Sequence, residues 1–384
     1  MPVLRSVRER FAAEQPLKGV KVGACLHVTA ETANLARALA AGGAEVALCA
    51  ANPLSTQDDV VEVLASEMLV RAKRGTDPRP GVAEVATWGP HVTLDDGADL
   101  IALLHEGDAL VDGFLGGTEE TTTGLVRVRA LDLRCPVLAL NEARTERVFN
   151  DHYGTGQSTL DGILRATNVL LAGRTVVIVG YGFTGRGIAT RARGAGAQVI
   201  ICEVDPLAAL EARMEGFEVM PALAAAARGD IFITVTGTPR VLGAEHFAVM
   251  KDGASLANAG HFDVEIDLDA LAAAATERRQ VLPLVESFTL ASGRRLHLLA
   301  QGRVVNLAAG QGHPAEIMDI SFAVHALAVE HLVTRGGSLA PGIHPVPEPI
   351  DREVARLKLA ALGVGIDALT PEQEAYRHSW GGAA

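Results

Sequence analysis

A glycine-rich turn between two short apolar segments is the feature that most limits how this chain of 384 residues can fold. The segment Thr175–Val179 is β-branched and apolar on both faces, as expected for a buried parallel strand. The turn GYGFTG follows directly, and apolar residues then recur at helical spacing. A second buried run, Gln198–Cys202, ends at Glu203. This order of strand, turn, helix, strand and acid predicts a Rossmann-type unit.

Each part of this unit has a chemical reason. Gly180 permits the tight turn, Gly182 lets the backbone approach a pyrophosphate, and Gly185 lets the helix pack closely on the strand. The unpaired N–H groups at the start of the helix attract phosphate. Glu203 lies 23 positions beyond Gly180, where an acid accepts hydrogen bonds from a ribose 2′-hydroxyl and repels a 2′-phosphate. The sequence therefore predicts NAD rather than NADP as the cofactor.

Composition and charge exclude several other classes of protein. The net charge of −12, from 34 basic and 46 acidic residues, opposes binding to nucleic acid. The four cysteines are scattered without a CxxC pair, so neither a metal site nor a disulfide framework is expected. The first residues carry charges throughout and no later stretch reaches membrane-span length, so neither a signal peptide nor a membrane partner is expected. These features predict a cytoplasmic protein.

Polar clusters follow several predicted strands in the first 140 residues. They come after the strands predicted at 20–25, 45–49 and 92–94, and the threonines at 121–123 open a predicted helix. Open α/β sheets bind their ligands at the carboxyl ends of the strands. The expected fold class is therefore α/β, with a Rossmann-type NAD domain and a second doubly wound α/β domain that binds substrate.

The sequences of these clusters resemble motifs of the S-adenosylhomocysteine hydrolase (adenosylhomocysteinase) family. The matching stretches, in chain order, are CLHVTAET, STQDD, LDDGAD, TEETTTG, YGTGQSTLDGILRATN, GYGFTGRG, MEGFEV, GHFDVEID, GRVVNLAAGQGHP and LTPEQEAYRHSW. The likeness covers nearly the whole chain, and the YGTGQS wording is that of archaeal-type members. It implies a discontinuous substrate domain at 1–145 and 315–345, an NAD domain at 156–312, and a C-terminal helix and tail at 346–384. It also implies a homotetramer.

The resemblance further implies a reaction on an adenine nucleoside. NAD stays bound and oxidises the 3′-hydroxyl to a ketone, which acidifies the neighbouring 4′ C–H. The 5′ substituent is then eliminated, water adds in the hydrolases, and the ketone is reduced. The transient ketone matters because an unactivated thioether carbon offers no easy route for its leaving group.

Taken residue by residue, the resemblance assigns roles to individual positions. Asp96 matches the family's base for the 4′ proton, and His27 matches the group that handles the 5′ leaving group and water. The substrate-binding positions are Thr29, Glu31, Glu120 and His313. The cofactor-binding positions are Thr121, Thr122, Thr123, Asp151, Gly180, Gly182, Phe183, Thr184, Gly185, Glu203, Gly260, His261 and Asn306. Each residue alone also has an ordinary structural interpretation, such as a turn, a helix cap or a buried histidine.

The sequence departs from the family pattern at the segment that handles the 3′-hydroxyl. The family places a lysine and an aspartate where this chain has Glu146 and Asn150, and an asparagine where it has Asp151. A cation is thus replaced by an anion, and an anion by a neutral amide. We expect Glu146 and Asn150 to belong to the catalytic site, with Glu146 replacing the lysine as the base for the 3′-hydroxyl.

Three hypotheses follow from this departure. The favoured one is a diverged nucleoside lyase or dehydratase that oxidises and eliminates on a related adenine nucleoside. The alternative is a genuine S-adenosyl-L-homocysteine hydrolase, which releases adenosine and homocysteine. A minor alternative is an inactive sensor of NAD or nucleoside, although a sensor would not require the elimination base Asp96.

Overall fold

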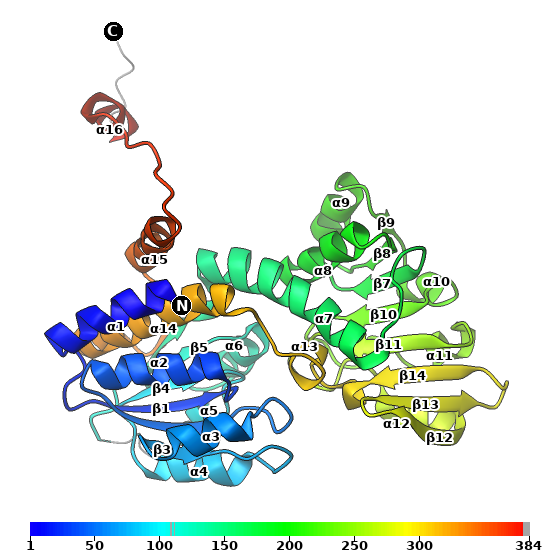
Figure 1. Cartoon of the computed structure of the whole chain (residues 1–384), viewed down its shortest axis with the longest axis horizontal. Helices are drawn as coiled ribbons and strands as arrows, with labels where there is room; N and C mark the ends of the chain where they lie inside the picture. Colours follow the sequence, from blue (N-terminus) through cyan, green and yellow to red (C-terminus); the bar gives the residue numbers. More distant parts are fainter. Residues whose placement is uncertain (108–109, 111, 379–384) are drawn as a thin grey trace.

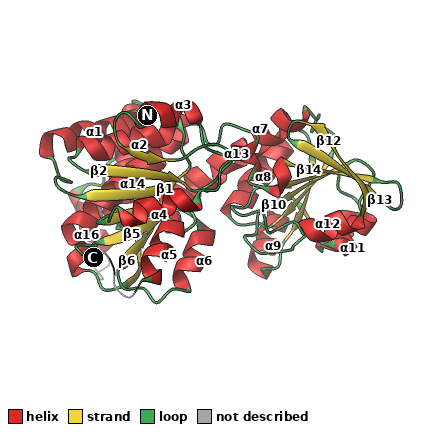
Figure 2. Cartoon of the chain, turned by 90° about the horizontal axis from the view of Figure 1, so that it is seen from below, coloured by secondary structure: helices red, strands yellow, loops and turns green. Residues whose placement is uncertain are grey.

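The computed structural model describes residues 1–107, 110 and 112–378, and the last six residues of the predicted tail lie outside this part. Two β-sheets lie side by side, each with helices packed against it (Figure 1). Seen from below, the two bodies meet in the region of α7 (Gly156–Thr167) and α13 (Val305–Ala308) (Figure 2). The predicted α/β fold class is confirmed, with a Rossmann-type unit beside a second α/β layer.

The first sheet is parallel, with the strand order β15-β6-β5-β4-β1-β2-β3. Its strands are β1 (Lys21–Leu26), β2 (Glu45–Ala50), β3 (Leu69–Arg71), β4 (Val92–Asp95), β5 (Gly116–Glu119), β6 (Pro136–Ala139) and β15 (Gly342–Pro345). The helices of this part are α1 (Pro2–Glu14), α2 (Ala30–Ala41), α3 (Asp58–Leu64), α4 (Arg79–Thr87), α5 (Asp99–Glu106), α6 (Thr122–Arg129), α14 (Ala315–Arg335), α15 (Glu348–Ala361) and α16 (Pro371–His378). The chain leaves this sheet after β6 and returns to it only through α14 and β15.

Helix α14 is the central helix of the first core. It packs against α1, α2 and α15, and its apolar side chains join the same buried cluster as the strands. Within the described residues it is the one helix long and apolar enough to cross a membrane, but 67% of its most apolar window is buried inside the protein. Its hydrophobicity is therefore explained by its place in the core.

The second sheet has the order β12-β13-β14-β11-β10-β7-β8-β9. Its strands are β7 (Thr175–Val179), β8 (Gln198–Cys202), β9 (Glu218–Val219), β10 (Ile231–Thr234), β11 (Ala254–Asn258), β12 (Ala275–Leu282), β13 (Val285–Leu290) and β14 (Arg295–Leu299). The helices besides α7 and α13 are α8 (Phe183–Gly194), α9 (Pro206–Met214), α10 (Ala222–Ala226), α11 (Ala244–Val249) and α12 (Leu268–Ala274). Strands β7 to β11 are parallel, and β12 and β13 add an antiparallel edge.

A π-helical segment, Glu146–Thr155, joins the two parts of the chain. It continues without interruption into α7, and it packs against both α8 of the second part and α14 of the first. Wide helical turns of this kind are often found at functional sites, because the extra residue re-aims side chains. Here the segment carries Glu146, Asn150 and Asp151 to the boundary between the two sheets.

Candidate active site

One large cavity, of about 1480 Å³, lies between the carboxyl ends of the two sheets. Its walls come from the polar strand ends of the first part, from the glycine turn of the second and from α14. A pocket for one small ligand usually measures about 300–1000 Å³, so this cavity has room for a dinucleotide and a second molecule. All of the predicted site residues line it except Gly185, below the turn, and Glu146, which is buried behind its wall.

The glycine turn has the geometry that a dinucleotide requires. Gly180 has a φ of +107°, and a Cβ there would approach the carbonyl oxygen of Val235 at 2.7 Å. A Cβ at Gly185 would meet the carbonyl oxygen of Gly180 at 2.1 Å, so this glycine allows α8 to close on β7. A Cβ at Gly182 would meet no atom of the described protein within 4 Å. Gly182 therefore faces open space at the N-terminus of α8, which fits a pyrophosphate.

Glu203 lies at the end of β8 and faces this turn. Its carboxylate accepts hydrogen bonds from the backbone N–H groups of Tyr181 at 2.6 Å, Val204 at 2.6 Å and Asp205 at 3.0 Å. These bonds fix the carboxylate beside the open glycine turn, where the predicted ribose hydroxyls would reach it. The turn, the helix N-terminus and this acid together fit an NAD molecule.

A buried acid, Glu265, lies behind the part of the cavity wall formed by Thr236, Gly237 and Gly260. It accepts hydrogen bonds from the N–H groups of Thr236 and Gly237, both at 2.8 Å, and a Cβ at Gly260 would overlap one of its oxygens. Burial raises the pKa of Glu265, against the lowering effect of these backbone bonds. The sequence did not single out this residue, because an acid in a loop after a strand resembles an ordinary surface residue.

Asp96 lies between two histidines at the end of β4. His27 Nε2 is 3.2 Å from one of its carboxylate oxygens, and His261 Nδ1 is 3.4 Å from the other. The Nδ1 of His27 is 2.5 Å from the hydroxyl of Ser55. Burial lowers the pKa of His27, partly offset by the Asp96 charge, so the ring is neutral at pH 7. The donor atoms of the two histidines and Asp96 lie within 4.8 Å of one another, close enough to bind a metal ion. The expected absence of a metal site therefore remains a prediction.

His313 and Asn306 come from the segment that returns toward the first sheet. His313 Nε2 is 3.0 Å from the hydroxyl of Thr155, and burial lowers the pKa of this histidine to about 4. The Asn306 amide donates a hydrogen bond to the hydroxyl of Ser158 at 3.1 Å. Both side chains are thus held by α7 or the segment before it, and both line the cavity.

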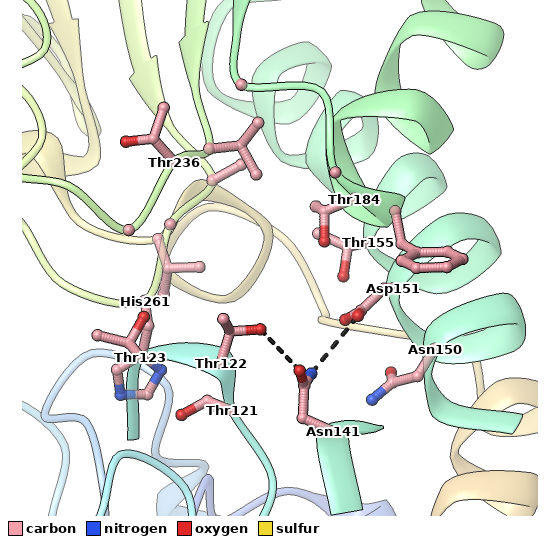
Figure 3. A pocket seen from close by; sticks show the side chains of 18 of the residues that line it. Thr121, Thr122, Thr123, Asn141, Asn150, Asp151, Thr155, Thr184, Thr236 and His261 are labelled. Atoms are coloured by element: carbon pink, nitrogen blue, oxygen red, sulfur yellow. Dashed lines mark hydrogen bonds between the residues drawn. The ribbon is translucent and has the colours of Figure 1, made fainter. Parts of the chain in front are cut away.

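The threonines at 121–123 connect α6 to the π-helical segment. Thr121 caps α6 by accepting a hydrogen bond from Gly124 N–H at 2.9 Å. Thr122 donates to the side chain of Asn141 at 2.7 Å, and Asn141 donates to Asp151 at 3.4 Å, as the dashed lines of Figure 3 show. Burial raises the pKa of Asp151 to about 7. This chain of polar groups crosses the boundary between the two parts of the protein.

The predicted substrate residues Thr29 and Glu31 lie at the start of α2. Thr29 is the N-cap residue, and its hydroxyl accepts a hydrogen bond from Thr32 N–H. Glu31, the second residue of the helix, is half-buried and lines the cavity. Thr29 thus stabilises the start of α2, whatever its role in binding.

Glu120 lies at the centre of a polar cluster in the wall of the cavity. It accepts a hydrogen bond from the Asn150 amide at 2.7 Å and one from the hydroxyl of Ser321 at 3.4 Å, while His325 Nε2 is 2.5 Å from its other oxygen. Burial, and then the charges of Asp96 and Asp151, raise the pKa of Glu120 well above its usual range. His325 was not predicted, because it lies within the apolar helix α14.

Glu146 lies beside this cluster but forms no hydrogen bond with it. Its side chain is 1% exposed, and neither carboxylate oxygen has a hydrogen-bond partner among the described residues. Burial and then the nearby Glu120 raise the pKa of Glu146 well above its usual range. Because an ionised carboxylate without a partner is very costly to bury, these surroundings favour the protonated form.

The family model described as "S-adenosyl-L-homocysteine hydrolase" matches residues 1–115, and "S-adenosyl-L-homocysteine hydrolase, NAD binding domain" matches residues 151–312. An adenosylhomocysteinase of Aquifex aeolicus is 55% identical over 99% of this chain and 93% of its own length. An adenosylhomocysteinase of Thermosynechococcus vestitus is 53% identical over 99% and 91%. An S-inosyl-L-homocysteine hydrolase of Methanopyrus kandleri is 51% identical over 99% and 92%.

Proposed function

Because the chain belongs to the S-adenosyl-L-homocysteine hydrolase family and NAD is its cofactor, we propose that it hydrolyses an S-nucleosyl-L-homocysteine. S-adenosyl-L-homocysteine is the first candidate substrate, and the S-inosyl compound is the second, since relatives at similar identity carry both names. The observation that carries this proposal is the pair His27 and Asp96, held at 3.2 Å in the same cavity as the glycine turn. The relatives favour hydrolysis over the lyase or dehydratase hypothesis.

The side chains on the first sheet would perform the elimination. Bound NAD supplies the hydride acceptor that turns the 3′-hydroxyl into a ketone. Asp96 then removes the acidified 4′ proton, because it is a carboxylate facing the cavity with histidines on both sides. His27, neutral at pH 7, would take that proton from Asp96 at 3.2 Å and pass it to the leaving 5′ sulfur. When water is added, His27 would take a proton from the water and return it to Asp96 for delivery to C4′.

Glu31 would help to distinguish the nucleobase. A carboxylate accepts hydrogen bonds and does not donate them, so it pairs with the exocyclic amino group of adenine. Hypoxanthine carries a carbonyl oxygen at that position, which a carboxylate repels. This supports adenosine over inosine as the nucleoside part of the substrate.

A second candidate function rests on Glu146 and Asn150. The family resemblance implies a lysine and an aspartate there, whereas this chain has a buried carboxyl group and a buried amide. Such a change in the oxidation half of the site favours a different adenine nucleoside, with loss of a 5′ group other than homocysteine. An inactive sensor is the weakest hypothesis, because His27 and Asp96 are both in place.

A product analysis separates these functions. The NAD-loaded protein is offered S-adenosyl-L-homocysteine, S-inosyl-L-homocysteine and a panel of 5′-substituted adenine nucleosides, and the products are identified by mass. Release of homocysteine at ordinary enzymatic rates supports the hydrolase. Loss of a different 5′ group, with no homocysteine released, replaces it by the lyase or dehydratase. Asp96→Asn is the control, because it should retain NAD and stop every elimination.

A further inference from the structure

His325 is a buried titratable residue that the reaction described above leaves without a role. It lies on α14, where its side chain is fully buried, and its ring packs edge-on against Phe322 at 5.6 Å between centroids. Ser321, one turn earlier on the same helix, also points toward Glu120. A histidine inside the core helix of a domain requires a partner, and its partner here is a residue of the cavity wall.

The contacts of Glu120 show what the histidine does. Asn150 and Ser321 donate hydrogen bonds to one oxygen of Glu120, and His325 Nε2 lies 2.5 Å from the other. The second ring nitrogen, Nδ1, is buried without a partner in the described part of the chain. Burial lowers the pKa of His325 to about 4, so the ring carries one proton at neutral pH. With that proton on Nε2, all three neighbours donate to Glu120, and these bonds oppose the burial and the charges of Asp96 and Asp151 that raise its pKa.

Glu146 has the opposite surroundings. Its carboxyl oxygens make no hydrogen bond of ordinary geometry within the described residues, although Ser321 and His325 lie near enough to lower its pKa against the effect of burial. Glu146 does not line the cavity, whereas Glu120, Asn150 and His325 do. The charged groups around the pair are Asp96 from the end of β4 and Asp151 on the π-helical segment, together with Arg147, which faces Asp151. Two adjacent buried carboxyls in an acidic site do not both ionise, and the one with donors keeps the charge.

We propose that His325 is a positioning residue for the oxidation step, which holds Glu120 ionised through its Nε2–H so that Glu120, and not Glu146, accepts the 3′-hydroxyl proton. The inference rests on the proposed function only in that a nucleoside 3′-hydroxyl enters this cavity. In the step, the O–H bond breaks and its proton passes to the free oxygen lone pairs of Glu120. The C–H electron pair would leave as hydride for the acceptor that bound NAD supplies, and a C=O bond forms. Glu146 stays protonated behind the wall.

This assignment also accounts for the two departures from the family pattern. An aspartate at position 150 would face Glu120 with another negative charge, whereas the Asn150 amide donates to it. A protonated Glu146 is neutral and adds no charge to the cluster. The two substitutions and His325 thus together leave one carboxylate ionised at the cavity wall.

The protonation states are tested first, without substrate, on the NAD-loaded protein. Infrared difference spectra with ¹³C-labelled glutamate detect a protonated carboxyl group at neutral pH. We expect this band to disappear in Glu146→Gln and to persist in Glu120→Gln. Disappearance in Glu120→Gln with persistence in Glu146→Gln would overturn the assignment, and so would the absence of any such band in the unmodified protein. Failure of the proposed substrate leaves this measurement unaffected.

The second test measures the rate of NADH formation in single turnovers with the nucleoside that the product analysis identifies. Glu146→Gln should retain the rate within about threefold, whereas Glu120→Gln should lose at least about 100-fold, the lower range for a positioned base. If Glu146→Gln abolishes NADH formation instead, Glu146 is the base and the proposal is wrong.

The role of His325 is tested by the pH profile of the same reaction. His325→Leu removes the donor to Glu120, so the acid limb should move upward by about 1–2 pH units, the size expected for a hydrogen bond to a charged group. His325→Gln keeps an N–H donor and should restore the profile. His331→Gln, on the same helix outside the cavity, is the matched control. An unchanged acid limb in His325→Leu, or no rescue by His325→Gln, would contradict the positioning role.

Discussion

Asp95 shows how a single buried carboxyl group couples stability to pH. It lies at the end of β4, and its oxygens accept hydrogen bonds from the N–H groups of Leu100 and Ile101 at the start of α5, at 2.7 to 3.3 Å. Burial nevertheless raises the pKa of Asp95 to about 7, because desolvation outweighs these bonds. The native protein thus binds a proton here between about pH 4 and pH 7 that the unfolded chain does not bind.

We predict that the free energy of unfolding of Asp95→Asn, relative to that of the unmodified chain, increases as the pH rises from 4 to 8. The raised pKa of Asp95 stabilises the native protein fully below about pH 4, the pKa of an aspartate in the unfolded chain. That stability is lost as the pH rises through 7. An asparagine keeps the acceptor for Leu100 and Ile101 but does not titrate. The gain in the free energy of unfolding between these limits should be at most about 4 kcal/mol. Urea unfolding at several pH values measures it, and parallel pH curves for the two proteins would refute it.

Glu203 provides a second test at the level of a single residue. Its carboxylate is held by the N–H groups of Tyr181, Val204 and Asp205. We predict that Glu203→Ala weakens NAD binding by roughly 1.5–3 kcal/mol, the range for hydrogen bonds to a charged acceptor. Glu203→Gln should lose less, since its amide oxygen still accepts. Calorimetric titration of the cofactor-free protein with NAD checks this, and unchanged affinity in Glu203→Ala would exclude the ribose contact.

The turn between β7 and α8 allows a matched pair of substitutions at the scale of an element. Gly182 has a φ of −73° and open space around a Cβ, whereas a Cβ at Gly185 would overlap the backbone of Gly180. We predict that Gly182→Ala folds with normal stability and binds NAD at least about tenfold more weakly. Gly185→Ala should instead lower the unfolding temperature, because α8 must move away from β7. Thermal unfolding with and without NAD separates the two, and equal behaviour would show that the turn serves backbone geometry alone.

The sequence predicted those helices and strands whose apolar pattern is bounded by turn residues at both ends. The strands β7 and β8, with the glycine turn and α8 between them, follow the expected order. The antiparallel hairpin of β12 and β13 was not predicted, because β12 is an exposed strand with the charged run Glu277-Arg278-Arg279, and its conformation comes from pairing with β13. Periodicity within one segment carries no information on such pairing.

The site was predicted in part for a similar reason. Residues at strand ends were found because the position itself is informative. Asn141, Glu265 and His325 were missed, because each acts through a contact with a residue far away in the sequence. For His325 one signal was present: Ser321 and His325 are polar residues four positions apart in an apolar helix, which places both on one face.

At the scale of the whole molecule, the end of the chain extends away from the two sheets (Figure 1). Helix α15 packs against α1 and α14 and buries Val354. The exposed apolar side chains come after it, at Leu362, Val364, Ile366 and Leu369. This segment is therefore the better place for contact with a second copy of the chain.

We predict that the protein is oligomeric, with a tetramer as the expected form. Replacing Leu362 and Ile366 by glutamate should reduce the mass in solution, because a charged side chain cannot be buried unpaired in an apolar contact. Light scattering at micromolar concentration measures the mass, with Val126→Glu as a control at another exposed apolar position. A monomeric unmodified protein would contradict the prediction, and a mass unchanged by the double substitution would place the contact elsewhere.

The return of α14 and β15 to the first sheet has a consequence for how the protein is made. Ribosomes deliver the chain from its N-terminus, so the first six strands of that sheet emerge long before the helix that fills their core. Until about 335 residues have left the exit tunnel, one face of the nascent sheet lacks its cover, while the inserted second sheet already has all of its strands. We therefore expect the inserted second sheet, in the middle of the polypeptide, to acquire its native shape before the first sheet does. A chaperone holding the nascent chain would find its binding surface on the first sheet.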